Sequence, residues 1–152
     1  MQSAVFRTAW VILLFFVFTG SAAFSSGADP SRWKLVGFTK YRDALFLDRE
    51  SLERLPGDTL KATVKISPSP KSKFLRQLRK ELKARGKSAG FLGHVEYSME
   101  IDCRANAMRF IHAAYYRKDG KLIYERDYTA DGWKPVTAGS LWDMLHESAC
   151  SK

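Results

Sequence analysis

The stretch HVEYSMEIDC, residues 94–103, decides the fold. Its apolar and polar side chains alternate without a break, as Val95, Tyr97, Met99, Ile101 and Cys103 against His94, Glu96, Ser98, Glu100 and Asp102. Because successive side chains of a strand point to opposite sides of a sheet, the pattern predicts a strand with one buried and one solvated face. Cys103 belongs to the apolar set, so we expect it to point into the core.

The sequence has one other cysteine, Cys150, near its C-terminus. A final helix is predicted there, because Ser140 can cap it and Asp143 can return the bond as in a capping box. In an oxidising compartment a lone pair of cysteines is best explained as one disulfide. We therefore expect a Cys103–Cys150 bond that joins this helix to the sheet. Two reduced, buried thiols are the alternative if the chain is not exported.

Other segments also favour strands of one antiparallel sheet: residues 33–38, 44–48, 60–66, 107–117 and 121–128. The third of these alternates apolar and polar residues like the 94–103 stretch. The last two flank Asp119-Gly120, a strong hairpin signal because the tight turn needs positive φ at both central residues.

A different pattern occupies residues 71–87, which carry eight basic residues and the single acid Glu81. At helical spacing the apolar side chains share one arc, namely Phe74, Leu75, Leu78 and Leu82. The cations that gather opposite are Arg76, Lys80, Lys83 and Lys87. The segment predicts a basic amphipathic helix ended by Gly86 or Gly90. These four cations are the candidate binding residues for an anionic partner, although such charges usually form only a solvated face.

The N-terminus has the layout of a secretory signal peptide: Arg7, an apolar run over residues 9–18, then small residues. We expect cleavage after Ala23, with Ala28 as a second site and an uncleaved N-terminal anchor as the alternative. The chain then divides into a signal peptide (1–23), a flexible tether (24–31) and a single domain (32–152). No cysteine in the leader is available for lipid attachment, so both the periplasm and the outer surface remain open.

The sequence is poor in catalytic patterns. It has no HExxH, CxxC, CxxCH, GxSxG or P-loop motif, and its three histidines, His94, His112 and His146, share no spacing. Glu96, Glu100 and Asp102 share a strand face and can in principle act as acid and base, but a solvated edge facing Lys or Arg on a neighbouring strand is favoured. We therefore expect that the protein is not an enzyme and that it binds no cofactor, metal or small-molecule substrate.

A set of landmarks follows in order along the chain: Trp33, Asp48 with Ser51, Ile101-Asp102-Cys103, Arg104, Arg109, Tyr116 before Lys-Asp-Gly, Trp133 with Pro135 and Val136, Gly139-Ser140, and Cys150. This order resembles the surface-adhesin protein E family of Gram-negative bacteria over residues 32–150. The resemblance implies an α+β fold, with an antiparallel sheet of about six strands packed with the basic helix and a C-terminal helix. The best-known member of that family attaches the bacterium to host matrix and plasma proteins.

Two departures from the family pattern are Ala138, where a proline is common, and the missing leader cysteine. No matrix-binding residue can be carried over, because the landmarks are core and turn residues. Three hypotheses remain: an adhesin-like binding module, an envelope structural protein whose basic helix contacts anionic lipid, lipopolysaccharide or an acidic polymer, and an enzyme. The formal net charge of +9 makes an anionic partner a hypothesis to consider, but nucleic acid is not expected, because export removes the chain from it. The sequence gives no indication of oligomeric state.

Overall fold

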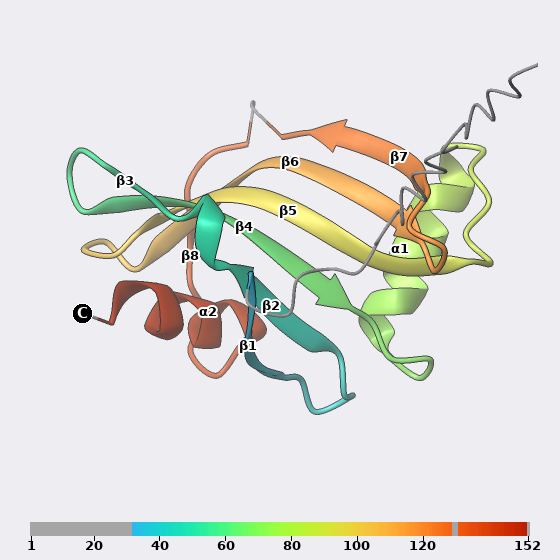
Figure 1. The fold of residues 1–152 in the computed structure, drawn as a ribbon, viewed down its shortest axis with the longest axis horizontal. Helices are drawn as coiled ribbons and strands as arrows, with labels where there is room; N and C mark the ends of the chain where they lie inside the picture. The colour runs from blue at the N-terminus through green and yellow to red at the C-terminus, as the bar shows by residue number, and fades with distance from the viewer. Residues whose placement is uncertain (1–31, 129–130, 152) are drawn as a thin grey trace, which may run out of the picture.

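One antiparallel sheet organises the chain in the computed structural model, which describes residues 32–128 and 131–151 (Figure 1). The expected signal peptide and tether, residues 1–31, lie outside the described residues. No helix in the described part of the chain is long and apolar enough to cross a membrane.

The sheet follows the order β1-β2-β4-β5-β6-β7, with β3 paired to β4 and β8 paired to β6. The strands are β1 (Trp33–Phe38), β2 (Ala44–Asp48), β3 (Glu53–Leu55), β4 (Thr59–Ser67), β5 (Leu92–Asp102), β6 (Ala107–Arg117), β7 (Leu122–Asp127) and β8 (Lys134–Pro135). A 3-10 turn, η1 (Arg49–Ser51), and the helices α1 (Lys73–Ala84) and α2 (Leu141–Cys150) complete the described elements. The predicted α+β class and all six expected strands are confirmed, while β3 and β8 are short additions that the sequence analysis did not predict.

The core lies on one face of the sheet, and both helices pack against that face. On β5, Val95, Met99 and Ile101 are fully buried, as the alternation predicted. The buried leucines of the helices join the same core: Leu75, Leu78 and Leu82 from α1, and Leu145 from α2. Figure 1 shows the helices near different ends of the sheet. The opposite face carries the polar residues of β4 and β5, and none of the described helices packs on it.

The basic helix spans Lys73–Ala84 and stops before Gly86, which is one of its two predicted ends. Ser72 caps its N-terminus by accepting a hydrogen bond from the Leu75 amide at 3.2 Å. Gly86, at φ +67°, ends it by entering the left-handed region, and the amides of Gly86 and Lys87 donate to the carbonyls of Lys83 and Leu82. The prediction that Lys87 lies on the helix with the other three cations was therefore wrong.

The Cys103–Cys150 disulfide is confirmed, with Cα atoms 5.6 Å apart and a sequence separation of 47. Cys103 lies just beyond the end of β5 and is half-buried at the rim of the core. The strand stops at Asp102 because its Oδ1 accepts hydrogen bonds from the amides of Arg104 and Ala105, which turns the chain. The disulfide therefore ties the end of the sheet to the end of α2.

The N-terminus of α2 differs in one detail from the predicted capping box. Ser140 Oγ accepts from the Asp143 amide at 3.2 Å, as expected. The return bond, however, runs from the Gly139 amide to Asp143 Oδ2 at 2.7 Å. The Ser140 amide, which a capping box would use for this bond, donates instead to the Thr137 carbonyl at 3.1 Å, and Gly139 adopts φ +71° at this turn.

We expect Cys150→Ala to lower the free energy of unfolding by about 2–5 kcal/mol, because the open chain regains conformational entropy when unfolded. Urea unfolding of the exported protein measures this, with Ser151→Ala as a neighbouring control. Mass spectrometry of the alkylated, unreduced wild type should show no labelled thiol. Two labelled thiols would contradict the bond.

Candidate binding surfaces

The exposed side of α1 carries cations that form no ion pair with an acid of the described residues. Arg76, Lys80 and Lys83 are exposed, and none of the three forms an ion pair with a described carboxylate. Arg79 is also exposed and flanks this row. The helix's one acid, Glu81, is already engaged, since its Oε1 lies 2.9 Å from Arg126 on β7 and 3.9 Å from Arg85.

Three sets of contacts fix which side of α1 faces outward. The buried leucines hold one side on the core, and the Glu81–Arg126 pair ties the helix to β7. The Arg85 guanidinium also lies 5.1 Å from the centre of the Tyr124 ring. The structure thus brings together three of the four predicted binding residues, and places Lys87 beyond the Gly86 turn, exposed but off the helix.

The helix-free face of the sheet is lined by paired charges. Glu100 on β5 contacts Arg109 on β6 at 2.6 Å, and Glu96 is the register partner of Lys65 on β4. The expectation that these acids face Lys or Arg on neighbouring strands is confirmed for Glu96 and Glu100. It was wrong for Asp102, whose neighbours across the sheet are Thr59 and Ala107. The expectation of an edge was wrong, because β5 lies between β4 and β6 in the interior of the sheet.

A cation and two aromatic rings meet on this same face, near β1. The Lys65 ammonium lies 4.1 Å from the centre of a Trp33 ring and 5.2 Å from that of Phe46. Burial lowers the pKa of Lys65, and the Glu96 carboxylate opposes this by a smaller amount. Leu35, 45 % exposed, extends the apolar surface. Sequence analysis missed this cluster; its only signal was that Trp33, Leu35 and Phe46 occupy alternating positions on two short strands.

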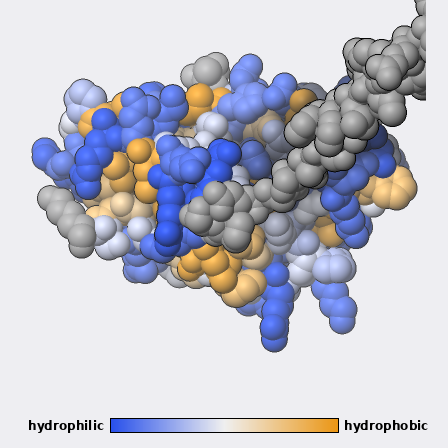
Figure 2. Space-filling view, in the orientation of Figure 1, coloured by the Kyte–Doolittle hydropathy of each residue, from blue (hydrophilic) through white to orange (hydrophobic). Residues whose placement is uncertain are grey.

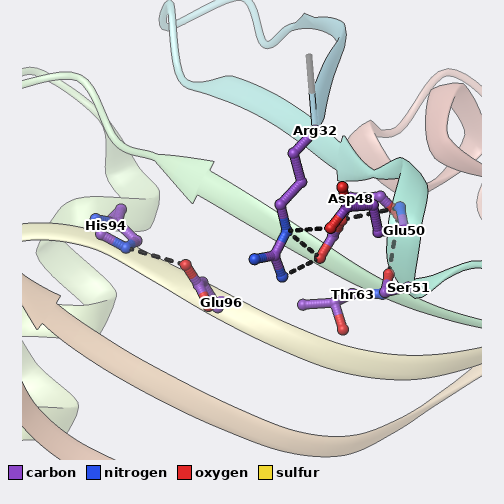
Figure 3. Close-up of polar contacts among 7 residues, drawn as sticks. All are labelled: Arg32, Asp48, Glu50, Ser51, Thr63, His94 and Glu96. Carbon is purple, nitrogen blue, oxygen red and sulfur yellow. Dashed lines mark hydrogen bonds and ion pairs between the residues drawn. The ribbon is translucent and has the colours of Figure 1, made fainter. Parts of the chain in front are cut away.

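Figure 3 shows the ion pair that closes this end of the sheet, between Arg32 and Asp48. Asp48 is fully buried and also accepts from the Glu50 amide at 3.1 Å. Its carbonyl accepts from Ser51 Oγ, which in turn accepts from the Thr63 amide of β4 at 2.7 Å. Burial disfavours the charged carboxylate, but the hydrogen bonds from Arg32 and Glu50 outweigh it and hold the pKa of Asp48 below its usual value.

The histidines do not converge. His94 stacks on Tyr116 with ring centres 4.8 Å apart and lies 3.3 Å from Glu96, as drawn in Figure 3. His112 Nδ1 is 2.8 Å from Asp127 Oδ1. His146 lies beside the disulfide, whose sulfurs are bonded to each other and so offer no thiolate to a metal.

Comparison with protein families gives one match. The model of the family described as surface-adhesin protein E matches residues 33–151. No curated protein and no solved structure matches the chain. The family match spans all the strands and both helices of the described domain.

We expect Asp48→Asn to destabilise the domain by about 1–3 kcal/mol at pH 7, because Arg32 loses its charged acceptor. Because the pKa of Asp48 is lower in the folded state, its carboxylate stabilises the folded protein at pH values above the unfolded aspartate pKa of about 3.9. This contribution is lost as the pH falls through the folded-state pKa. The difference between wild type and variant should therefore shrink in acid. Urea titrations at several pH values test this; a difference that stays constant down to pH 2 would contradict it.

Proposed function

Because the chain belongs to the surface-adhesin protein E family, we propose that it is an exported envelope or surface protein that acts as a non-enzymatic binding module. The disulfide supports export, since such bonds persist in oxidising compartments. We further propose that residues 1–23 are a cleaved signal peptide, that 24–31 are a tether and that 32–152 are the binding domain.

We infer an anionic partner from the basic face of α1. This face is defined as Arg76, Lys80 and Lys83 on the helix, together with Lys87 beyond the Gly86 turn. The helix holds three of these cations outward on a rigid, core-packed element. None of them forms an ion pair with a described acid, so they remain available to attract an anionic partner, to an extent that salt reduces. An acidic protein or polysaccharide fits an adhesive role.

The same face supports a second candidate, a periplasmic structural protein that contacts anionic lipid, lipopolysaccharide or an acidic polymer. Lysine and arginine near an anionic membrane contribute about 1 kcal/mol each. The two candidates share the chemistry of the partner and differ in where the protein is located.

Location is the first test. We expect the mature protein to begin near Phe24, because Ser21 and Ala23 provide the small residues that precede cleavage. N-terminal sequencing of protein from the source cell measures this, and an intact Met1 in the membrane fraction would contradict it. Digestion by protease on intact cells supports the adhesive module, whereas protection until the outer membrane is opened supports the periplasmic candidate.

Charge reversal of the basic face is the second test. We expect Arg76→Glu, Lys80→Glu, Lys83→Glu and Lys87→Glu together to abolish binding to heparin, lipopolysaccharide and phosphatidylglycerol vesicles. The melting temperature should change by only a few degrees, because these side chains are exposed. Wild-type binding should weaken between low and physiological salt, as the screening length falls to about 8 Å.

A matched control reverses the same amount of charge elsewhere. Arg49, Arg54, Lys118 and Lys121 are exposed and form no ion pair with a described acid, so changing these four to Glu should leave most of the binding in place. Equal loss in the control would show that only net charge matters. Failure of the wild type to bind any of the three probes at low salt would show that the face is merely solvated.

A further inference from the structure

A groove of about 580 Å³ opens between the N-terminal ends of the two helices and the turn that joins β1 to β2. Most of its lining is apolar, contributed by Phe38, Tyr41, Phe74, Leu141, Trp142 and Met144. In the space-filling view, hydrophobic surface gathers on the side of the molecule where Figure 1 places this turn (Figure 2). The volume falls within the range of about 300–1,000 Å³ typical of small-ligand sites.

The rim of the groove carries two lysines that come from separate elements. Lys40 lies in the β1–β2 turn and Lys73 begins α1, yet their ammonium groups lie 5.2 and 5.9 Å from the centre of the same Tyr41 ring. Neither forms an ion pair with a carboxylate of the described chain. The structure thus brings two positive charges to one edge of an apolar groove.

Asp43, the acid that lines the groove, is not available to pair with the Lys40 and Lys73 ammonium groups. It is 2 % exposed, and its two oxygens accept from the Ser69 amide at 2.8 Å and from Thr39 Oγ1 at 2.9 Å. Its role is to hold the β1–β2 turn against the segment that leads into α1. The two ammonium groups at the rim are therefore free to meet a negative charge from outside.

The apolar wall is held in place by the core beneath it. Trp142 meets Phe110 and Tyr97 edge-on, with ring centres 5.1 and 6.0 Å apart. Met144 packs so closely on β1 that a Cβ at Gly37 would lie 3.1 Å from its sulfur. The wall is thus formed before any ligand arrives, which reduces the entropic cost of binding.

We propose that this groove binds an amphiphile with an acyl chain and an anionic head, the chain along Trp142, Leu141 and Phe74 and the head at Lys40 and Lys73. A purely apolar ligand leaves both ammonium groups without a partner, and a small free anion leaves the apolar wall in water. An acyl carboxylate or acyl phosphate satisfies both halves. The site is separate from the basic face of α1, whose residues do not line the groove, so the proposal stands apart from the function proposed above.

The test uses dodecanoate and dodecyl phosphate, each below its micelle-forming concentration, with calorimetry and tryptophan fluorescence on the mature, disulfide-bonded protein at physiological salt. The two ligands distinguish a carboxylate head from a phosphate head. We expect both to bind more tightly than dodecanol, and butyrate and inorganic phosphate to bind at least tenfold more weakly. Trp142→Phe should reduce the fluorescence change without abolishing the calorimetric signal.

Two variants separate the halves of the site. Lys40→Ala with Lys73→Ala should weaken binding of both amphiphiles by about five- to tenfold, since two partly exposed charge contacts are lost. Phe38→Ser should weaken binding of the acyl chain, and because Phe38 is 56 % exposed the fold should be preserved. Lys118→Ala with Lys121→Ala is the matched control and should change affinity by less than twofold, as should charge reversal of the basic face.

Three results would overturn the proposal. The first is that the wild-type protein binds neither amphiphile. The second is that the affinity is unchanged when Lys40 and Lys73 are replaced by alanine, and the third is that dodecanol binds as tightly as dodecanoate. A peptide of leucine and aspartate that binds at least tenfold more tightly than dodecanoate would assign the groove to an acidic, apolar peptide instead.

Discussion

The constraint on which the rest of the structure depends is the burial of one face of the β4–β5 pair. Eight consecutive register pairs join these strands, and their inward side chains form the centre of the core. Both helices reach that core from the same side. A helix that packs on this face must turn its other side to solvent, so the one-sided core determines where α1 displays its cations. It also leaves the opposite face of the sheet open for its own charge pairs and the Trp33–Lys65–Phe46 cluster.

Each helix is held to the sheet by a second restraint beyond its leucines. For α2 the restraint is covalent, because the disulfide joins its last residue to the end of β5. For α1 it is ionic, because Glu81 meets Arg126 of β7. Their N-termini lie on either side of the groove, which therefore depends on both restraints. Loss of either one is expected to widen the groove or to change its lining.

The sequence predicted what depends on local patterns and missed what depends on strand pairing. Alternation predicted the strands at 60–66 and 94–103, short apolar runs those at 33–38 and 44–48, and the Asp119-Gly120 turn the last hairpin. The cysteine count predicted the disulfide. Gly86 was one of the two predicted ends of α1 and is confirmed, but Lys87 was grouped with the helical cations because charge and periodicity continue past the left-handed Gly86. The short strands β3 and β8 carry too few residues to show a period. The Lys65 cluster and the pair of lysines over Tyr41 are tertiary arrangements, which require residues from two or three elements to meet.

The family landmarks explain the fold more fully than the function. Asp48 and Ser51 connect Arg32, η1 and β4, Asp102 ends β5, and Gly139 with Ser140 starts α2. Each of these polar landmarks is engaged in a hydrogen bond or ion pair within the domain, so its chemistry is already used there. The residues proposed to meet a partner lie outside that set: the cations of α1, Phe38, Lys40 and Lys73. Since a shared architecture does not by itself specify a ligand, the family match accounts for the fold of this chain, and the identity of its partner depends on these exposed positions.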